Sequence, residues 1–242
     1  MPNIKCRIAE LNVLISTENA TLLRQAEKYR FDFSGEPDIP VCIPEDMLEN
    51  QLVKNNLSRE VGEYLLTGDL FYRRLLKFDG FVMHASAIAY DRKAYLFSAP
   101  CGTGKSTHAG LWRKYLGEDK VVSINDDKPA IRKVDGVFYA YGTPWSGKTD
   151  TSANIKVPLG GIVYLSRAQT PSIRRTDVVD GVKNLLWQTA RPATAKGMDK
   201  ILNLFEELLN SVPIWEMGCN ISEQSFRLSM ETLTGEQKTN GK

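Results

Sequence analysis

The sequence predicts an α/β protein with a mixed, hairpin-rich sheet flanked by helices. A strand-like run at 93–98 is followed by a glycine-rich loop and then by helical spacing up to residue 116. Strand-like runs also flank the short turns Asp91-Arg92 and Asp135-Gly136, as in β-hairpins. We therefore expect one domain over residues 1–242.

Composition excludes several classes of protein. The chain has 242 residues, of which 42% are hydrophobic and 25% charged, and its formal net charge is +2, so neither long disorder nor nucleic-acid binding is indicated. No run approaches the roughly 18 apolar residues of a membrane-spanning helix, which favours a cytoplasmic protein without a membrane partner. Cys6, Cys42, Cys101 and Cys219 form no CxxC pair, so we interpret them as reduced thiols rather than zinc ligands.

The first half of the chain alternates strand-like and helical segments. Residues 6–16 alternate as in a strand, and the proline-punctuated run 37–44 favours an edge strand. Residues 17–30 between them fit a helix or a loop. Apolar side chains recur at helical spacing over 58–78, where Gly68 is a candidate break that would divide the helix in two.

The second half continues this pattern. Residues 105–117 have helical spacing that ends at Gly117, a residue suited to a helix C-terminus. The other expected elements are a buried strand at 120–127, a hairpin at 129–142, a strand at 156–168, helices at 177–190 and 197–212, a strand at 213–218 and a serine-capped helix at 222–233. Residues 235–242 are expected to be a disordered tail.

The hairpin expected over 81–100 has a register that matters for function. Its turn is assigned to Asp91 and Arg92. Counting outward along both strands places His84 opposite Ala99, where the glycine-rich loop begins.

Residues 99–106, "APCGTGKS", fit the P-loop pattern with alanine at the first position. Glycines let the backbone curl around a phosphate and aim N–H groups at it, and the following helix adds its positive N-terminal end. Lys105 can reach the β- and γ-phosphates of a nucleotide, and the Ser106 hydroxyl can coordinate Mg²⁺. The candidate nucleotide-binding residues are Ala99, Cys101, Gly102, Thr103, Gly104, Lys105, Ser106 and Thr107. We interpret Cys101 as an incidental small residue rather than a nucleophile.

Asp126 and Asp127 end the strand after this loop, where P-loop proteins place a metal-binding carboxylate. Two carboxylates allow two roles, one at Mg²⁺ and one as the base that takes a proton from an attacking hydroxyl. Which aspartate has which role is left open. Both serve one site only if the chain bends there, and Pro129 favours a bend.

Two histidines and one loop complete the candidate site. His84, placed by the hairpin register, is either a core residue or a hydrogen-bonding group beside transferring phosphate. The spacing of His108 favours packing. Residues 142–158, which include Trp145 and Lys148, have no periodicity and are predicted to be either a mobile loop that closes over phosphates or an ordinary surface connection.

The order of His84, "SAPCGTGKST", "NDDKPAI" and "GTPWSGK" resembles the catalytic domain of the HPr kinase/phosphorylase family, whose fold is shared with phosphoenolpyruvate carboxykinase. The resemblance covers about residues 80–167, the expected P-loop core. It implies a bacterial, cytoplasmic kinase that uses ATP and Mg²⁺ to phosphorylate a serine hydroxyl, and a homo-oligomer is compatible with it. The matching residues are His84, Lys105, Ser106, Asp126 and Asp127.

The sequence also departs from that family. The glycine-rich "RGxG" stretch that HPr kinases carry after their carboxylates is absent. The expected acceptor is therefore a serine-bearing peptide or protein, or a small hydroxyl metabolite, rather than HPr. Two alternatives remain open: a nucleotide-binding regulatory protein that transfers no phosphate, and a simple ATPase.

Overall fold

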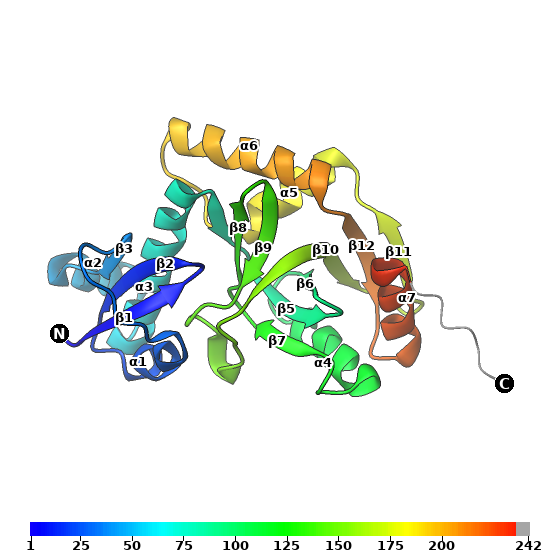
Figure 1. The fold of residues 1–242 in the computed structure, drawn as a ribbon, viewed down its shortest axis with the longest axis horizontal. Helices are drawn as coiled ribbons and strands as arrows, with labels where there is room; N and C mark the ends of the chain where they lie inside the picture. The colour runs from blue at the N-terminus through cyan, green and yellow to red at the C-terminus, as the bar shows by residue number, and fades with distance from the viewer. Residues whose placement is uncertain (236–242) are drawn as a thin grey trace.

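One long strand, β10 (Lys156–Arg167), organises the main sheet of the computed structural model, which describes residues 1–235 (Figure 1). Its first residues pair antiparallel with β9 (Val137–Tyr141). Its later residues pair parallel with β6 (Lys93–Ser98) on one side and with β12 (Ile214–Cys219) on the other. β10 thus joins an antiparallel part of the sheet to a parallel part.

The main sheet has nine strands of mixed direction. Its order is β4 (Gly80–Val82), β8 (Ala130–Val134), β9, β10, β6, β5 (Ala85–Tyr90) and β7 (Val122–Asn125), with β12 beside β10 and β11 (Ser172–Arg175) beside β12. The expected mixed, hairpin-rich α/β architecture is confirmed. The hairpin register is also confirmed, because Tyr90 pairs with Lys93 and Ala85 with Ser98.

The direction of the strands brings several loops to one edge of this sheet. β6, β10 and β12 are parallel, and β7 runs the same way as β6 because both are antiparallel to β5. The carboxyl ends of all four strands therefore share an edge, where ligands bind in open α/β sheets. Residues 99–104 follow β6 and Asp126 and Asp127 follow β7 at this edge.

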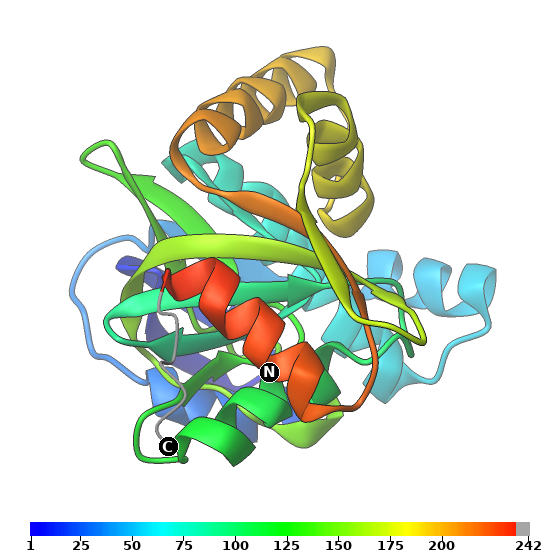
Figure 2. The ribbon, with the colours of Figure 1, turned by 90° about the vertical axis from the view of Figure 1, so that its right-hand side faces the viewer.

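Helices cover both faces of the main sheet, because successive strand residues point to opposite faces (Figure 2). α5 (Val178–Gln188) and α6 (Ala195–Ser211) pack on the face that carries Leu96 and Ile162. α4 (Lys105–Leu116) and α7 (Glu223–Thr234) pack on the face that carries Phe97 and Val163. The helix after the glycine-rich loop is thereby fixed to the sheet and to α7.

A smaller sheet forms the N-terminal side of the molecule (Figure 1). Its elements are β1 (Asn3–Ile8), β2 (Leu11–Ser16), α1 (Ala20–Ala26) with a 3₁₀ turn at Glu27–Tyr29, β3 (Ile39–Cys42), α2 (Glu45–Asn55), and α3 (Arg59–Leu75) with a 3₁₀ turn at Leu76–Phe78. β3 is an edge strand, as expected. The prediction of a single strand over 6–16 is wrong: Ala9 and Glu10 turn the chain with φ of 51° and 65°.

The predicted break at Gly68 is also wrong, because α3 continues from Arg59 to Leu75. A Cβ at Gly68 would lie 2.8 Å from the Tyr72 hydroxyl oxygen and 3.1 Å from Cδ1 of Trp145. The glycine is needed for close packing against Trp145, and its helix-weakening effect is overridden by that tertiary contact.

The remaining predicted helices and strands of the second half are found close to their expected bounds. The strand predicted to be buried at 120–127 is instead an edge strand, β7, in which Val122 is 43% exposed. α4 ends at Gly117, and Ser222 caps α7. Within residues 1–235, no helix is both long and apolar enough to cross a membrane. The expected tail lies outside the described residues except for Gly235, and the assignment of one domain stays a prediction.

Gly142 fixes the chain where β9 turns toward the shared edge. An added Cβ would lie 2.1 Å from the Ala153 carbonyl oxygen and 2.8 Å from that of Ile124. We expect Gly142→Ala to lower the free energy of unfolding by about 1–3 kcal/mol, because backbone atoms cannot move aside as a side chain can. Urea denaturation measures this. Gly110→Ala in α4, where no atom lies within 4 Å, is the matched control and should be neutral or stabilising.

Candidate functional site

The glycine-rich loop, residues 99–104, joins β6 to α4 at the shared edge. Gly102 and Gly104 have φ of 75° and 116°, a region that other residues rarely adopt. Gly104 is the N-cap of α4, so the first N–H groups of a 12-residue helix face the loop. Ala99 is 2% exposed and has no positive φ, so alanine satisfies a position that is usually glycine.

Lys105 lies along the inside of this loop. Its Nζ donates to the Ala99 carbonyl oxygen over 3.1 Å, and the residue is 8% exposed. Burial lowers the pKa of Lys105, while the nearby Asp127 opposes this effect. A cation is thus held at the loop, where the negative charge of a phosphate would compensate its lost hydration.

The side chain of Asn125 turns the chain immediately after β7. Its Oδ1 accepts from the backbone N–H groups of Asp127 at 2.9 Å and Lys128 at 2.7 Å, and its Nδ2 donates to the Thr143 carbonyl oxygen. This is an Asx turn, and it brings Asp126 and Asp127 to the same cavity. The predicted bend is present, but Asn125 makes it.

Asp126 accepts hydrogen bonds from the hydroxyl groups of two elements. Its Oδ1 accepts from Ser86 Oγ over 2.6 Å, and its Oδ2 accepts from Thr149 Oγ1 over 3.2 Å. Ser86 Oγ also lies 3.3 Å from Ser106 Oγ at the start of α4. Asp126 and Ser106 therefore belong to one cluster of oxygen atoms.

Asp127 faces different groups. Its Oδ1 lies 3.4 Å from His84 Nε2 and 3.5 Å from Lys128 Nζ. Burial, together with the charges of Lys128 and Lys105, lowers the pKa of His84 to about 4, although Asp127 and a contact with Gln188 oppose the shift. The imidazole is consequently neutral at pH 7, and its contact with Asp127 is not an ion pair.

Residues 142–149 close one side of the site. Trp145 is fully buried, stacks on Phe71 with 4.9 Å between ring centroids, and lies within 3.4 Å of the Thr67 hydroxyl in α3. The predicted loop is therefore anchored over 142–146, where every residue is buried. Of these residues, only Lys148 and Thr149, in the 3₁₀ turn Gly147–Thr149, border the cavity with exposed side chains.

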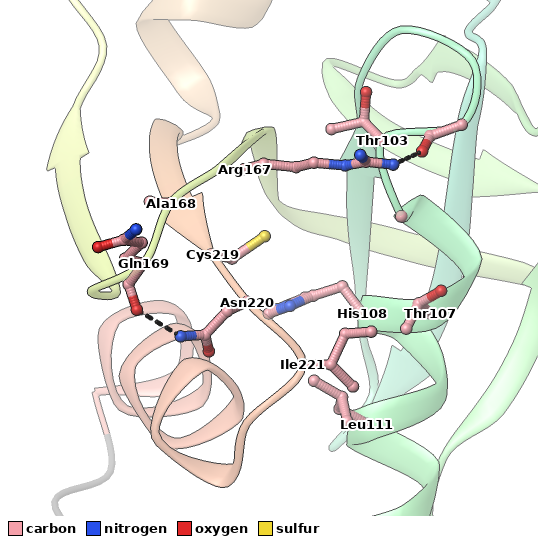
Figure 3. Close-up of a pocket in the computed structure, with 12 residues that line it drawn as sticks. Thr103, Thr107, His108, Leu111, Arg167, Ala168, Gln169, Cys219, Asn220 and Ile221 are labelled. Carbon is pink, nitrogen blue, oxygen red and sulfur yellow. Dashed lines mark hydrogen bonds between the residues drawn. The ribbon is translucent and has the colours of Figure 1, made fainter.

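Two adjoining cavities meet at the glycine-rich loop. The site cavity, about 430 Å³, is lined by His84, Cys101, Gly102, Gly104, Lys105, Ser106, Thr107, Asp126, Asp127, Ser146, Gly147, Lys148 and Thr149. The β10–β12 cavity, about 530 Å³, shares Gly102, Gly104 and Thr107 with it. Its other walls are Thr103, His108 and Leu111, the turn after β10 at 167–169, and the turn after β12 at 219–221 (Figure 3).

The structure brings most of the predicted site residues together. Ala99 lies beneath the loop and Thr103 lines the β10–β12 cavity rather than the site cavity. His108 packs as predicted, with Nε2 3.0 Å from Ser229 Oγ and its ring against Phe97, and it also borders the β10–β12 cavity.

Sequence reasoning missed several residues of the site. Ser86 was detectable, because the strand expected over 81–90 places it two positions after His84 on the same face, although the structure interrupts that strand between β4 and β5 at Met83 and His84. Lys148 and Thr149 were expected only as part of the loop over 142–158, because they carry no periodic signal that would single them out. Arg167 gave none either, although its Nη2 donates to the Gly102 carbonyl oxygen over 2.6 Å (Figure 3).

Comparison with known proteins gives little further guidance. No family model matches this chain, and no curated protein matches it. Among solved structures, it is similar to the HPr(Ser) kinase/phosphatase from Coxiella burnetii, with 12% identity and a TM-score of 0.38. That match covers 64% of this chain and 88% of the other. At this level of similarity, the roles of the residues must come from the site itself.

The contact between Arg167 and Gly102 provides a test of the loop. Arg167→Ala removes a charged donor from the loop carbonyl, so we expect ATP, the ligand predicted from the sequence, to bind about three- to tenfold more weakly. Isothermal titration calorimetry measures this. Arg174→Ala in β11 removes an arginine that pairs with Glu216 instead, and it should leave ATP affinity unchanged.

Proposed function

We propose that this chain is an ATP- and Mg²⁺-dependent phosphotransferase that moves the γ-phosphoryl group of ATP to a hydroxyl acceptor. One observation carries the proposal: two adjacent carboxylates in one cavity have different surroundings. Asp126 lies among hydroxyl groups that include Ser86 and Thr149, whereas Asp127 lies beside a neutral imidazole. Protein kinases use one carboxylate at Mg²⁺ and another that orients and deprotonates the acceptor hydroxyl.

The two cavities would accommodate the two ends of a nucleotide. The phosphates would lie along the backbone of the glycine-rich loop, at the N-terminal end of α4. The nucleoside would occupy the β10–β12 cavity, which borders the same loop and has a volume typical of small-ligand sites. Leu111 and Ile221 offer apolar surface there, and the Asn220 side chain offers polar atoms (Figure 3).

The residues near Ser106 fit a magnesium ion. Mg²⁺ prefers oxygen ligands and, in phosphate-transfer sites, takes one or two of them from the protein and others from the phosphates. The Ser106 hydroxyl and the Asp126 carboxylate would supply that number. When bound, Mg²⁺ would neutralise charge on the β- and γ-phosphates.

The chain's own residues would perform the remaining steps. Lys105 and Lys148, which line the site cavity, would place positive charge beside the transferred group. The Asp127 carboxylate would accept the proton as the acceptor oxygen attacks the γ-phosphorus and the bond to the β-phosphate oxygen breaks. The neutral His84 ring, with its single proton on Nε2, would donate to Asp127 and so orient it, and the amide group of Gln188, 3.2 Å from Nδ1, would donate to that nitrogen.

Lys105→Ala tests whether ATP uses the glycine-rich loop. We expect ATP affinity to fall about tenfold or more and turnover to be lost, because a charge-assisted contact to phosphate disappears. Lys114→Ala, nine residues further along α4 and exposed, is the matched control. Equal ATP affinity in the two variants would contradict a phosphate site at this loop.

Asp127→Asn and Asp126→Asn separate the two carboxylate roles. Asp127→Asn should retain ATP binding but reduce turnover about 10²- to 10⁴-fold, the range for loss of a general base. Asp126→Asn should instead raise the Mg²⁺ concentration needed for half-maximal activity. Both are measured with γ-labelled ATP and hydroxyl acceptors.

The same assay distinguishes the alternatives. Label released as phosphate with water as the only acceptor would indicate an ATPase. Tight ATP binding with neither transfer nor release would indicate a regulatory protein. Loss of ATP binding and turnover to the same extent in Asp127→Asn would contradict its assignment as the base.

A further inference from the structure

A groove continues from the site cavity on the side away from the β10–β12 cavity. Its inner part, about 290 Å³, shares His84 with the site cavity. Its outer part, about 560 Å³, shares Tyr72, Val82 and Ala190 with the inner part. We call both parts together the α6 groove, because the outer part runs along the start of α6.

The outer part carries positive charge. Arg73, Lys77, Lys196 and Lys200 line it, and no carboxylate does. Arg73 and Lys200 have partners outside the lining, Asp69 at 2.6 Å and Asp79 at 3.0 Å. Within the described part of the chain, Lys77 and Lys196 have no ion pair. The groove therefore keeps an excess of positive charge after its own pairs are counted.

Lys196 also lies at the N-terminal end of α6, which is itself positive. Thr194 is the N-cap of this 17-residue helix, and its first turn holds no acidic residue but includes Lys196. Lysine near a helix N-terminus is unfavourable, because both the lysine and the helix end are positive. An anionic group bound in the groove would compensate both Lys196 and the positive end of the helix. The lysine does not stabilise α6, so its position is better explained by binding of an anion.

The inner part offers an aromatic surface next to the reacting groups. Trp187 in α5 is 76% exposed, and it lines the inner part with Tyr72 and Lys128. The end of α5 that carries Trp187 is fixed to the site cavity, because the backbone N–H of His84 donates to the Gln188 carbonyl oxygen over 2.8 Å. Exposed aromatic side chains beside a cavity are typical anchors for polypeptide partners.

We propose that the α6 groove binds an acidic polypeptide segment, whose hydroxyl-bearing residue enters the site cavity past His84 while its carboxylates lie in the outer part. The inference rests on the proposed phosphotransfer and names its acceptor class. A small metabolite would fill the site cavity or the inner part alone. The α6 groove instead adds an aromatic inner part and then a cationic outer part to the site cavity. This series fits an extended peptide with acidic residues on one side of its hydroxyl-bearing residue.

Binding is tested apart from catalysis. Short fluorescein-labelled peptides carry a serine flanked on one side by several aspartates, and the companion peptides replace the aspartates by lysine or by asparagine. Anisotropy with the full chain and non-hydrolysable ATP should show preference for the aspartate peptides, and added salt should weaken it. The reversed peptides, with aspartates on the other side of the serine, show in which direction the bound peptide runs along the α6 groove.

Charge reversal tests the location. In Lys77→Glu/Lys196→Glu, affinity for the aspartate peptide should fall about tenfold or more and affinity for the lysine peptide should rise. Lys114→Glu/Lys120→Glu, with one exposed lysine in the last turn of α4 and one in the turn after it, is the matched control and should change neither. Trp187→Ala should lower the affinity for all serine peptides without changing the preference for the aspartate peptides.

Each outcome decides between the two proposals. Equal binding of the aspartate, lysine and asparagine peptides, or an unchanged preference in the charge-reversed variant, overturns the groove inference. Label transfer to a small hydroxyl compound without such a preference overturns it too, while supporting phosphotransfer. Preferential binding that the charge reversal abolishes, with no label transferred from ATP to the serine, supports the groove but contradicts phosphotransfer.

Discussion

The turn made by the Asn125 side chain is the contact on which the site depends. Four strands direct their carboxyl ends to one edge, but a straight continuation of β7 would send Asp126 and Asp127 to opposite faces. Because Oδ1 of a buried asparagine accepts two consecutive backbone N–H groups, the chain bends and both carboxylates meet the glycine-rich loop. The hydrogen bonds of Asn125 Nδ2 to Thr143 hold the same bend against the segment that closes the site.

The parts of this arrangement that follow from neighbouring residues were predictable. A two-residue turn at Asp91 and Arg92, both with positive φ, sets the hairpin register, and with it the place of His84 beside the loop. The glycine-rich loop between β6 and α4 was predicted from the order of its glycines, a lysine and a hydroxyl residue. In each case, the residues that determine the structure are close in sequence, and their types allow few backbone conformations.

The parts that depend on distant contacts were not predictable. The turn at Ala9 and Glu10 has no glycine or asparagine to mark it, and Glu10 is held instead by Tyr141 and Lys156 from the main sheet. Gly68 was expected to end a helix, but its role appears only when Trp145 packs across it. The division between Asp126 and Asp127 depends on which side chains face them, and Ser86 and Thr149 lie far from them in sequence.

The anchoring of Trp145 gives the N-terminal sheet and its helices a part in the site, although no residue before Tyr72 lines the site cavity, the β10–β12 cavity or the α6 groove. Gln25 donates to the Gly147 carbonyl oxygen, Tyr64 accepts from the Gly147 N–H, and Lys28 contacts Asp150. These contacts, and the packing of Trp145 in the N-terminal hydrophobic core, hold residues 143–150 against the N-terminal part of the chain. The N-terminal layer therefore serves as scaffolding for the candidate site, so a substitution in its core can disturb a cavity that it does not line.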